Sequence, residues 1–388
     1  MLTKRIQGDK VIWVIAIILL VFSLLVVYSS TGLLAYRFKE GHAEYYLVKQ
    51  LIIVLFGLLL MYIAHRINFK YLSRISQIMM LVSIPLLILT LIFAPNNNES
   101  SRHLEFSVSG QLLSFQTFDF AKLALIMYIA RYLAKTKEET TDSRLSFIYI
   151  VAPILVVCGL ILRSNFSTAA ILFFVSFVML FIGKVRIKYL LSLLGIGIGV
   201  FVILITISIF FEGFMPRVDT WVSRMENFFN PDVGANYQVQ QSKIAVATGG
   251  LVGKMPGNST QRNFLPLPFS DYVYAIIIEE YGILGGIIVV FLYMILFFRS
   301  IKIARKCELK FGSFLVVGIS FLMILQALIN MGVAVDILPV TGQTLPFLSM
   351  GGTSLWFSCI GLGMILSVSK NIQEQNAGNP VTINYVTA

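Results

Sequence analysis

The sequence predicts an all-α, polytopic membrane protein with about ten membrane-spanning helices. Of its 388 residues, 57% are hydrophobic and only 13% are charged, and a soluble domain of this length could not bury so much apolar surface. Helices are expected because backbone N–H and C=O groups in lipid must be satisfied within each segment. The predicted spans cover residues 11–30, 46–64, 75–95, 116–134, 147–163, 167–183, 188–211, 272–298, 313–335 and 351–369.

The first apolar run is too long for the core of a signal peptide, and no small-residue cleavage site follows it. We therefore expect a retained helix. The three cysteines show no CxxC pairing, which indicates neither a disulfide nor a metal site. The three histidines are far apart in the sequence, which argues against a histidine metal cluster.

Basic residues are concentrated in alternate loops of this ten-span arrangement. They precede the first span and follow the second, fourth, sixth and eighth spans. The positive-inside rule therefore places these loops and both termini in the cytoplasm. The formal net charge of +11 reflects this topology. The sequence contains no soluble basic module, so we expect no nucleic-acid partner.

The same orientation makes the segment of about 60 residues from Glu212 to Ser270 extracytoplasmic. Loops of this length in a compact protein are usually functional or disordered, and this one is too rich in aromatic residues for simple disorder. Within it, TWVSRMENFF has apolar residues at helical spacing, which predicts a helix that either lies at the membrane interface or packs on the bundle. A second outer loop covers about residues 96–115. We expect one membrane domain over residues 1–370, with a large extracytoplasmic loop (212–271) between the seventh and eighth helices, and a cytoplasmic tail over 371–388.

A polar segment rich in glycine and proline, from Gly249 to Gly282, places one carboxylate, Asp271, directly before a long apolar helix. This carboxylate should lie at the boundary between water and lipid, where it suits chemistry on a substrate that is half sugar and half lipid. The alternative is structural, because Ser270 or Asp271 could simply be the N-cap of that helix.

Four motifs occur in order along the chain, and together they are specific. They are RxxxFFNPxxxxxYQxxQSxxAxxxGG (Arg224 to Gly250), GNSTQ (Gly257 to Gln261), LPxxxSDYVYAIIxEEYG (Leu265 to Gly282) and INMGVAVDILPVTGQTLPFLSMGGTS (Ile329 to Ser354). With these motifs the chain resembles the SEDS family of bacterial cell-wall polymerases over nearly its whole length. Asn258, Ser259 and Gln261 are more similar to the division (FtsW) members, whereas Thr341 points to the elongation (RodA) members.

The chain departs from the usual pattern of this family at four places. The family's Arg-Trp pair appears as Arg102-His103, its FQPSE as FQTFD with Asp119, its Pro-Asp as Ser164-Asn165, and its LPE as Leu265-Pro266-Leu267. These departures leave Asp271 untouched.

The resemblance implies polymerisation of lipid II, a disaccharide-pentapeptide on undecaprenyl pyrophosphate. A sugar hydroxyl is a poor nucleophile at neutral pH, so a carboxylate base should assist it, and the leaving pyrophosphate needs cations. Asp271 fits the base. The resemblance further implies that substrate is bound by Arg102, Gln116, Asp119, Lys122, Arg217, Arg224, Ser259, Gln261 and Glu279.

Several of these residues have a structural alternative. Lys122 lies inside an apolar span, where a charge demands a partner or a function, and Asp119 at i−3 could be only its ion-pair partner. A buried pair with a basic residue is likewise the alternative for Glu279 and Glu280. The outer-face arginines could be solvated or paired. The glycines between Gly249 and Gly257 lack the strand and helix of a nucleotide site.

Other functions of this membrane domain stay open at the sequence level. A lipid II flippase should alternate access around a midplane site, and a scaffold would not need Asp271. The resemblance implies a class B penicillin-binding transpeptidase as partner, together with other division proteins and membrane lipids, at the septum of the cytoplasmic membrane. No cofactor is expected with certainty. The cationic charge that the pyrophosphate needs could come from Lys, from Arg or from a bound Mg or Mn ion.

Overall fold

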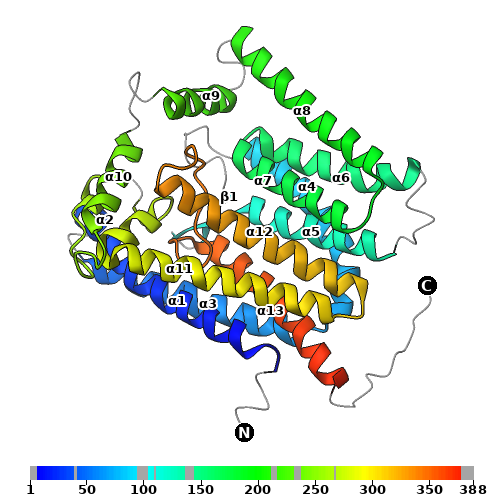
Figure 1. The fold of residues 1–388 in the computed structure, drawn as a ribbon, viewed down its shortest axis with the longest axis horizontal. Helices are drawn as coiled ribbons and strands as arrows, with labels where there is room; N and C mark the ends of the chain where they lie inside the picture. The colour runs from blue at the N-terminus through cyan, green and yellow to red at the C-terminus, as the bar shows by residue number, and fades with distance from the viewer. Residues whose placement is uncertain are drawn as a thin grey trace.

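All ten predicted spans form helices in the computed structural model (Figure 1). The structure describes residues 7–38, 42–93, 104–108, 111–135, 144–210, 216–230, 237–265 and 268–376. The helices that correspond to the predicted spans are α1 (Lys10–Ser30), α3 (Ala43–Arg66), α4 (Phe69–Phe93), α5 (Thr117–Lys135), α6 (Arg144–Leu162), α7 (Phe166–Ile182), α8 (Ile187–Phe210), α11 (Val273–Lys306), α12 (Lys310–Ala334) and α13 (Gly352–Asn376).

Seven of the described helices are long and apolar enough to cross a membrane, and two shorter apolar helices lie in α6 and α7. Helix α5 differs because Asp119, Lys122 and Arg131 interrupt its apolar sequence, and all three side chains are buried. Neighbouring helices therefore shield α5 from lipid. The polytopic, helical membrane fold is confirmed.

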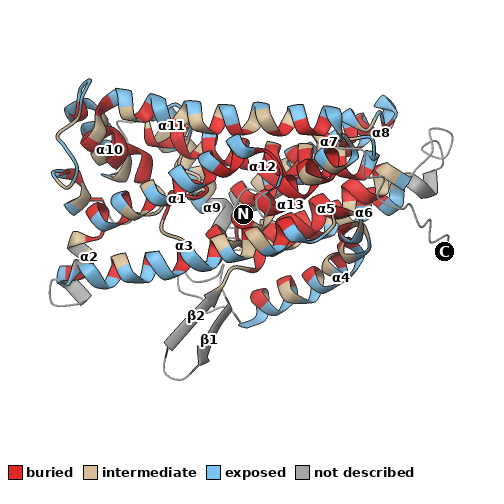
Figure 2. Ribbon diagram, turned by 90° about the horizontal axis from the view of Figure 1, so that it is seen from below, coloured by how far each residue is buried: buried red, intermediate tan, exposed pale blue. Residues whose placement is uncertain are grey.

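The core of the bundle lies around α5, α12 and α13, whereas α8 is largely exposed (Figure 2). Small residues let the central helices approach closely. A Cβ atom on Gly318 of α12 would lie 2.6 Å from the Met179 sulfur of α7 and 2.7 Å from Ile126 of α5. A Cβ atom on Gly363 of α13 would lie 2.5 Å from the backbone oxygen of Met61 in α3. Larger residues at these glycines would push the helices apart.

The segments between the spans carry further elements, of which the sequence predicted only one. They are α2 (Gly32–Phe38), an antiparallel hairpin of β1 (Leu104–Val108) and β2 (Gln111–Phe115), α9 (Pro216–Phe229), α10 (Tyr237–Gly249) and a short 3₁₀ turn η4 (Gln261–Asn263). The hairpin lies in the second outer loop, for which the sequence analysis predicted no secondary structure. Its signal was the alternation of apolar and polar residues in Leu104–Val108, which is typical of a strand.

The predicted helix within TWVSRMENFF is confirmed as α9, and it packs on the bundle. The ring centroid of Trp221 lies 4.6 Å from that of Phe166 in α7 and 5.2 Å from that of Phe201 in α8. Aromatic pairs at these separations stabilise a contact beyond their buried area. The packing alternative therefore describes α9 better than a free interfacial helix.

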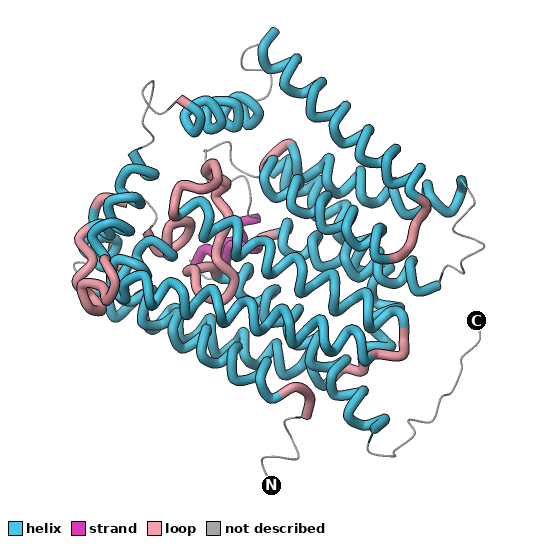
Figure 3. The backbone as a smooth tube through the Cα atoms, viewed as in Figure 1, coloured by secondary structure: helices cyan, strands magenta, loops and turns pink. Residues whose placement is uncertain are grey.

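Helix α11 is broken at Gly282, whose φ of 73° and ψ of −180° are not helical. The loop after α10 fills this break, and both lie in the large loop region at one end of the bundle (Figure 3). The backbone N–H of Ile283 donates to the backbone oxygen of Gly250 at 3.0 Å, and the backbone N–H of Lys254 donates to the backbone oxygen of Glu279 at 2.9 Å. Backbone groups freed by the break are thus satisfied by the loop, as a membrane segment requires.

Candidate active site

Asp271 lies immediately before α11, and its carboxylate does not cap that helix. The N-cap residue is Tyr272, which makes no side-chain capping bond. The Asp271 carboxylate is partly exposed and accepts a hydrogen bond from the Ser270 hydroxyl at 3.1 Å. The geometry therefore leaves this carboxylate free to meet a ligand.

The backbone at Asp271 is fixed by a buried amide near the end of α12. The side-chain amide of Asn330 in α12 donates to the backbone oxygen of Asp271 at 2.9 Å and to the backbone oxygen of Gln343 at 2.6 Å. The Gln343 side chain in turn donates to the Thr168 hydroxyl of α7 at 2.8 Å. Asp271 is thus positioned by two other helices and the loop between α12 and α13.

The same loop also holds the residues just before Asp271. The backbone N–H of Met350 donates to the backbone oxygen of Phe269 at 2.8 Å, and the Ser349 hydroxyl donates to the backbone oxygen of Ser270 at 2.7 Å. The sequence analysis missed this function of Asn330, Gln343 and Ser349. Their signal was present, because polar side chains within apolar spans or between them need partners.

Tyr272 follows Asp271 in the chain, and the charges of Asp271 and Arg224 both act on it. Burial raises the pKa of Tyr272 above its usual value, and the negative charge of Asp271 adds to that rise. The positive charge of Arg224 opposes it, and Arg224 also donates to the Val340 oxygen at 3.2 Å. Arg224 therefore stays a predicted cation of the site, and its hydrogen bond connects α9 to the loop between α12 and α13.

Three predicted substrate residues lie together at the start of α5. The Gln116 N–H donates to the Thr353 hydroxyl of α13 at 2.9 Å. Asp119 and Lys122 form an ion pair, with side-chain exposures of 6% and 7%. The ion-pair alternative is therefore present in the structure. One oxygen of Asp119 is buried without a hydrogen-bond partner among the described residues.

A double substitution separates the two functions considered for Lys122. We expect Lys122→Met alone to destabilise the protein by about 3–5 kcal/mol, because it leaves Asp119 buried and unpaired. Asp119→Asn/Lys122→Met removes both charges and should fold. If Lys122 assists the leaving phosphate, polymerisation by the double variant should still fall roughly 10²-fold. Full activity of the folded double variant would reduce the pair to a structural function.

Glu279 is fully buried, and donors from the preceding loop surround it. It accepts hydrogen bonds from the Lys254 ammonium at 2.6 Å, the Thr260 N–H at 3.1 Å and the Thr260 hydroxyl at 2.9 Å. Ser259 donates to its second oxygen, as does the Gln261 N–H at 3.2 Å. The buried pair with a basic residue, which was the alternative for Glu279, is therefore present in the structure, and Glu279 anchors the GNSTQ segment to α11.

Ser259 and Gln261 belong to the same anchor, since both are buried. The next carboxylate, Glu280, accepts a hydrogen bond from Ser29 at the end of α1. Arg262 donates to the Ser29 backbone oxygen at 2.8 Å. Glu280 and Arg262 therefore both contact Ser29, which connects α11 and the GNSTQ segment to the end of α1. Lys254 and Arg262 are residues that the sequence analysis missed.

Of the remaining predicted positions and departures, the structure describes the side chain of Asn165. Arg102, His103 and Leu267 lie outside the described residues. Arg217 falls in α9, but its side chain is not among those described. The departure at Asn165 preserves a structural function, because its side chain caps α7 by accepting the Thr168 N–H at 3.2 Å; asparagine and aspartate are about equally good at that position.

A family model described as "Cell cycle protein", which covers the FtsW, RodA and SpoVE proteins, matches residues 9–374. The chain belongs to this family. Stage V sporulation protein E of Bacillus subtilis is 30% identical over 380 residues, which cover 95% of this chain and 99% of that protein. The probable peptidoglycan glycosyltransferase FtsW of Coxiella burnetii is 31% identical over 376 residues, with 94% and 97% covered.

Two solved structures show the FtsW/RodA/SpoVE fold as well. A chain of a peptidoglycan synthase complex that coordinates polymerization and crosslinking superposes with a TM-score of 0.67 and 26% identity, over 91% of this chain and 97% of that one. The rod shape determining protein RodA of Thermus thermophilus superposes with a TM-score of 0.65 and 21% identity, over 94% and 97%. The resemblance drawn from the motifs is confirmed.

Proposed function

We propose that the chain is a peptidoglycan glycosyltransferase that polymerises lipid II at the outer face of the cytoplasmic membrane. The observation that carries the proposal is the Asp271 carboxylate, which is partly exposed, does not cap α11 and has its backbone fixed by Asn330. A rigid support of this kind holds a catalytic group in position at no cost during the reaction. The names of the relatives and of the synthase complex agree with this activity.

The proposed step moves one proton and exchanges one bond. The 4-hydroxyl oxygen of the acceptor sugar attacks the anomeric carbon of the donor while the bond from that carbon to the pyrophosphate oxygen breaks. Asp271 accepts the hydroxyl proton as general base. Attack opposite the leaving group inverts the anomeric carbon and gives a β-1,4 link. Arg224, and Lys122 at the start of α5, supply positive charge for the pyrophosphate.

A divalent cation has no complete site of its own among the described residues. They contain no group of three or more His, Cys, Asp and Glu side chains that could hold a metal ion. A Mg or Mn ion would therefore take most of its ligands from pyrophosphate oxygens and water, as Mg²⁺ commonly does. No step above depends on it.

The direct test is polymerisation of purified lipid II by the purified protein, followed as glycan chains on a gel. We expect chains from the wild-type protein and none above background from protein heated to unfold it. Well-folded protein that binds lipid II but makes no glycan, alone or with a transpeptidase, would refute the proposal.

We also propose that the partner of this chain is a class B penicillin-binding transpeptidase. The strands made from lipid II would be cross-linked by that partner, in synthesis of the septal wall rather than of the elongating wall. The partner should contact α11, α12 or the loop before them and raise the polymerase activity. Full activity of the chain alone, together with failure of the two proteins to co-purify, would overturn this proposal.

The proposed topology has both termini in the cytoplasm. Cysteine labelling should then find Ser259 outside and Arg305 inside, and the reverse would overturn it.

One observation favours a lipid II flippase as the second candidate. Transporters place substrate at broken helices near the midplane, and α11 is broken at Gly282. The break here, however, is filled by backbone of the loop after α10: a Cβ atom on Gly282 would lie 2.2 Å from the Leu251 oxygen. A filled break leaves no room for a substrate at that point, so catalysis at the outer face is better supported.

A further inference from the structure

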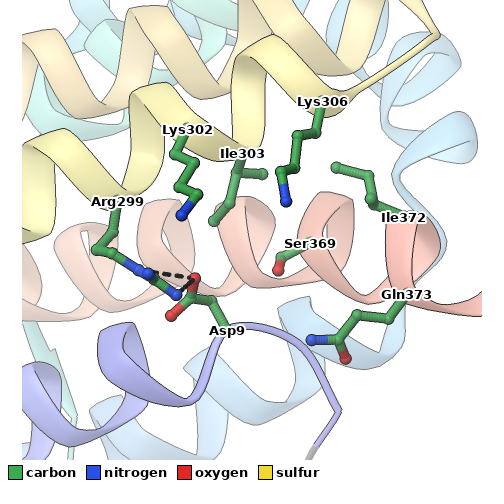
Figure 4. Close-up of a pocket in the computed structure, with 8 residues that line it drawn as sticks. All are labelled: Asp9, Arg299, Lys302, Ile303, Lys306, Ser369, Ile372 and Gln373. Carbon is green, nitrogen blue, oxygen red and sulfur yellow. Dashed lines mark hydrogen bonds and ion pairs between the residues drawn. The ribbon is translucent and has the colours of Figure 1, made fainter. Parts of the chain in front are cut away.

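A cationic recess lies at the end of the bundle opposite Asp271, where α1 begins and α11 and α13 end. Its volume is about 190 Å³, and it is lined by side chains of α11 and α13 and by Asp9, the N-cap residue of α1 (Figure 4). Nothing in the proposed polymerisation uses it. The recess has two walls, one of basic residues on α11 and one of polar and apolar residues on α13.

Arg299, Lys302 and Lys306 form the basic wall. Their spacings of three and four residues place them on one face of α11. Arg299 is held in place by Asp9, since two guanidinium nitrogens donate to one Asp9 oxygen at 3.0 and 2.6 Å. The other Asp9 oxygen accepts the Val11 and Ile12 N–H groups and caps α1. The Asp9 carboxylate is therefore fully used.

The two lysines have no such partner. Neither Lys302 nor Lys306 makes an ion pair or hydrogen bond with any residue that the structure describes, and Figure 4 shows both ammonium groups directed into the recess. Asp9 is the only acidic residue among those that line it. With three cations against one carboxylate, the described lining has a formal charge of +2.

The α13 wall combines a rigid polar group with an apolar floor. The Gln373 amide exchanges two hydrogen bonds with Gly8, at 2.9 and 3.0 Å, and is fixed by them. The Ser369 hydroxyl makes no hydrogen bond to a described residue and points into the recess. Ile372 of α13 and Ile303 of the facing α11 supply buried apolar surface to the lining. The recess thus offers hydroxyl and ammonium donors above apolar surface.

The position of the recess along α11 matches the headgroup region of a bilayer. After its break at Gly282, α11 continues to Lys306 for about 24 residues, or about 36 Å at roughly 1.5 Å per residue, whereas the hydrocarbon core is only ~30 Å thick. The apolar run of α11 ends at Phe298, directly before Arg299. The basic wall therefore begins where hydrocarbon gives way to phosphate.

We propose that this recess binds the phosphate of an anionic phospholipid headgroup, such as phosphatidylglycerol, on the side of the membrane that carries the basic loops. Lys302, Lys306 and Ser369 donate to the phosphate oxygens, and Ile303 and Ile372 contact the start of the acyl chains. Basic pockets between membrane helices are a known form of lipid recognition. Free inorganic phosphate shares the same charge chemistry but cannot use the apolar floor.

Native mass spectrometry of the detergent-purified full chain, titrated with phosphatidylglycerol or phosphatidylcholine, tests the proposal. We expect phosphatidylglycerol to bind more tightly, and Lys302→Gln/Lys306→Gln to weaken it roughly 25-fold, because each basic residue near the surface contributes about a factor of five. Lys302→Arg/Lys306→Arg should retain binding. The matched control is Arg305→Gln/Lys310→Gln, which removes the same charge from exposed positions outside the recess and should bind like wild type.

Three results would overturn the proposal. Equal loss in the control and recess variants would show general surface attraction. Equal affinity for the two lipids would show that headgroup charge is not recognised. Inorganic phosphate that displaces phosphatidylglycerol completely at equal concentration would assign the recess to a free anion. Each measurement is independent of glycan synthesis, so its failure leaves the proposed glycosyltransferase activity standing.

Discussion

Replacing Asp271 with asparagine should lower glycan polymerisation by at least roughly 10²-fold, the lower bound for loss of a general base. The substitution preserves size, and the Asn330 bond to residue 271 uses the backbone oxygen rather than the carboxylate. Folding and the shape of the loop should therefore survive. Binding of lipid II should change little, since the lost interaction belongs to the transition state. Single-turnover assays with purified lipid II measure both quantities.

A second carboxylate provides the matched control. Asp336 also lies near Tyr272, but the Lys243 ammonium 2.6 Å away neutralises it. Its φ of 61° is one that asparagine tolerates as well as aspartate does. Asp336→Asn should therefore leave polymerisation within about twofold of wild type. Asp271→Glu should lose part of its activity, because an error of about 1 Å in position can cost ~10²-fold. Near-normal activity of folded Asp271→Asn would remove Asp271 from the mechanism.

The membrane helices were predictable because lipid leaves a long apolar run few alternatives to a helix. Even α5 was found, although Asp119 and Lys122 interrupt it, since the rest of the run is apolar. The hairpin was not predicted, because five-residue strands give a weak signal beside the apolar spans. The break in α11 was also missed. A single Gly282 does not show that another segment will supply its missing hydrogen bonds.

For the site, the position of Asp271 at a helix entrance followed from the local order of polar and apolar residues. Its supports did not, because Asn330, Gln343 and Thr168 come from separate segments that only the fold brings together. For Glu279, the sequence identified the residue but not its environment. The family resemblance placed it among the substrate-binding residues, but its burial and its Lys254 partner depend on a loop that packs into the break.

Replacing Gly253 with alanine should unfold this end of the protein. Gly253 has a φ of +88°, and a Cβ atom there would lie 2.3 Å from the Glu280 oxygen and 2.4 Å from the Gly282 nitrogen. Both are backbone atoms that cannot turn away. The loop would have to leave the break in α11. The backbone hydrogen bond from Lys254 to Glu279 would then be exposed. The Glu279 carboxylate would be left buried without its donors. We expect a loss above about 4 kcal/mol, the range of severe single substitutions.

Gly257 allows the steric effect to be separated from backbone strain. Its φ of +83° nearly equals that of Gly253, yet no described atom lies within 4 Å of the Cβ position. Gly257→Ala should therefore cost only the roughly 1–2 kcal/mol of a left-handed alanine. Thermal unfolding in detergent and the yield of monodisperse protein would compare the two variants. Equal, mild losses at both glycines would mean that the loop is not packed into the break, and the Glu279 anchor would then lose its structural basis.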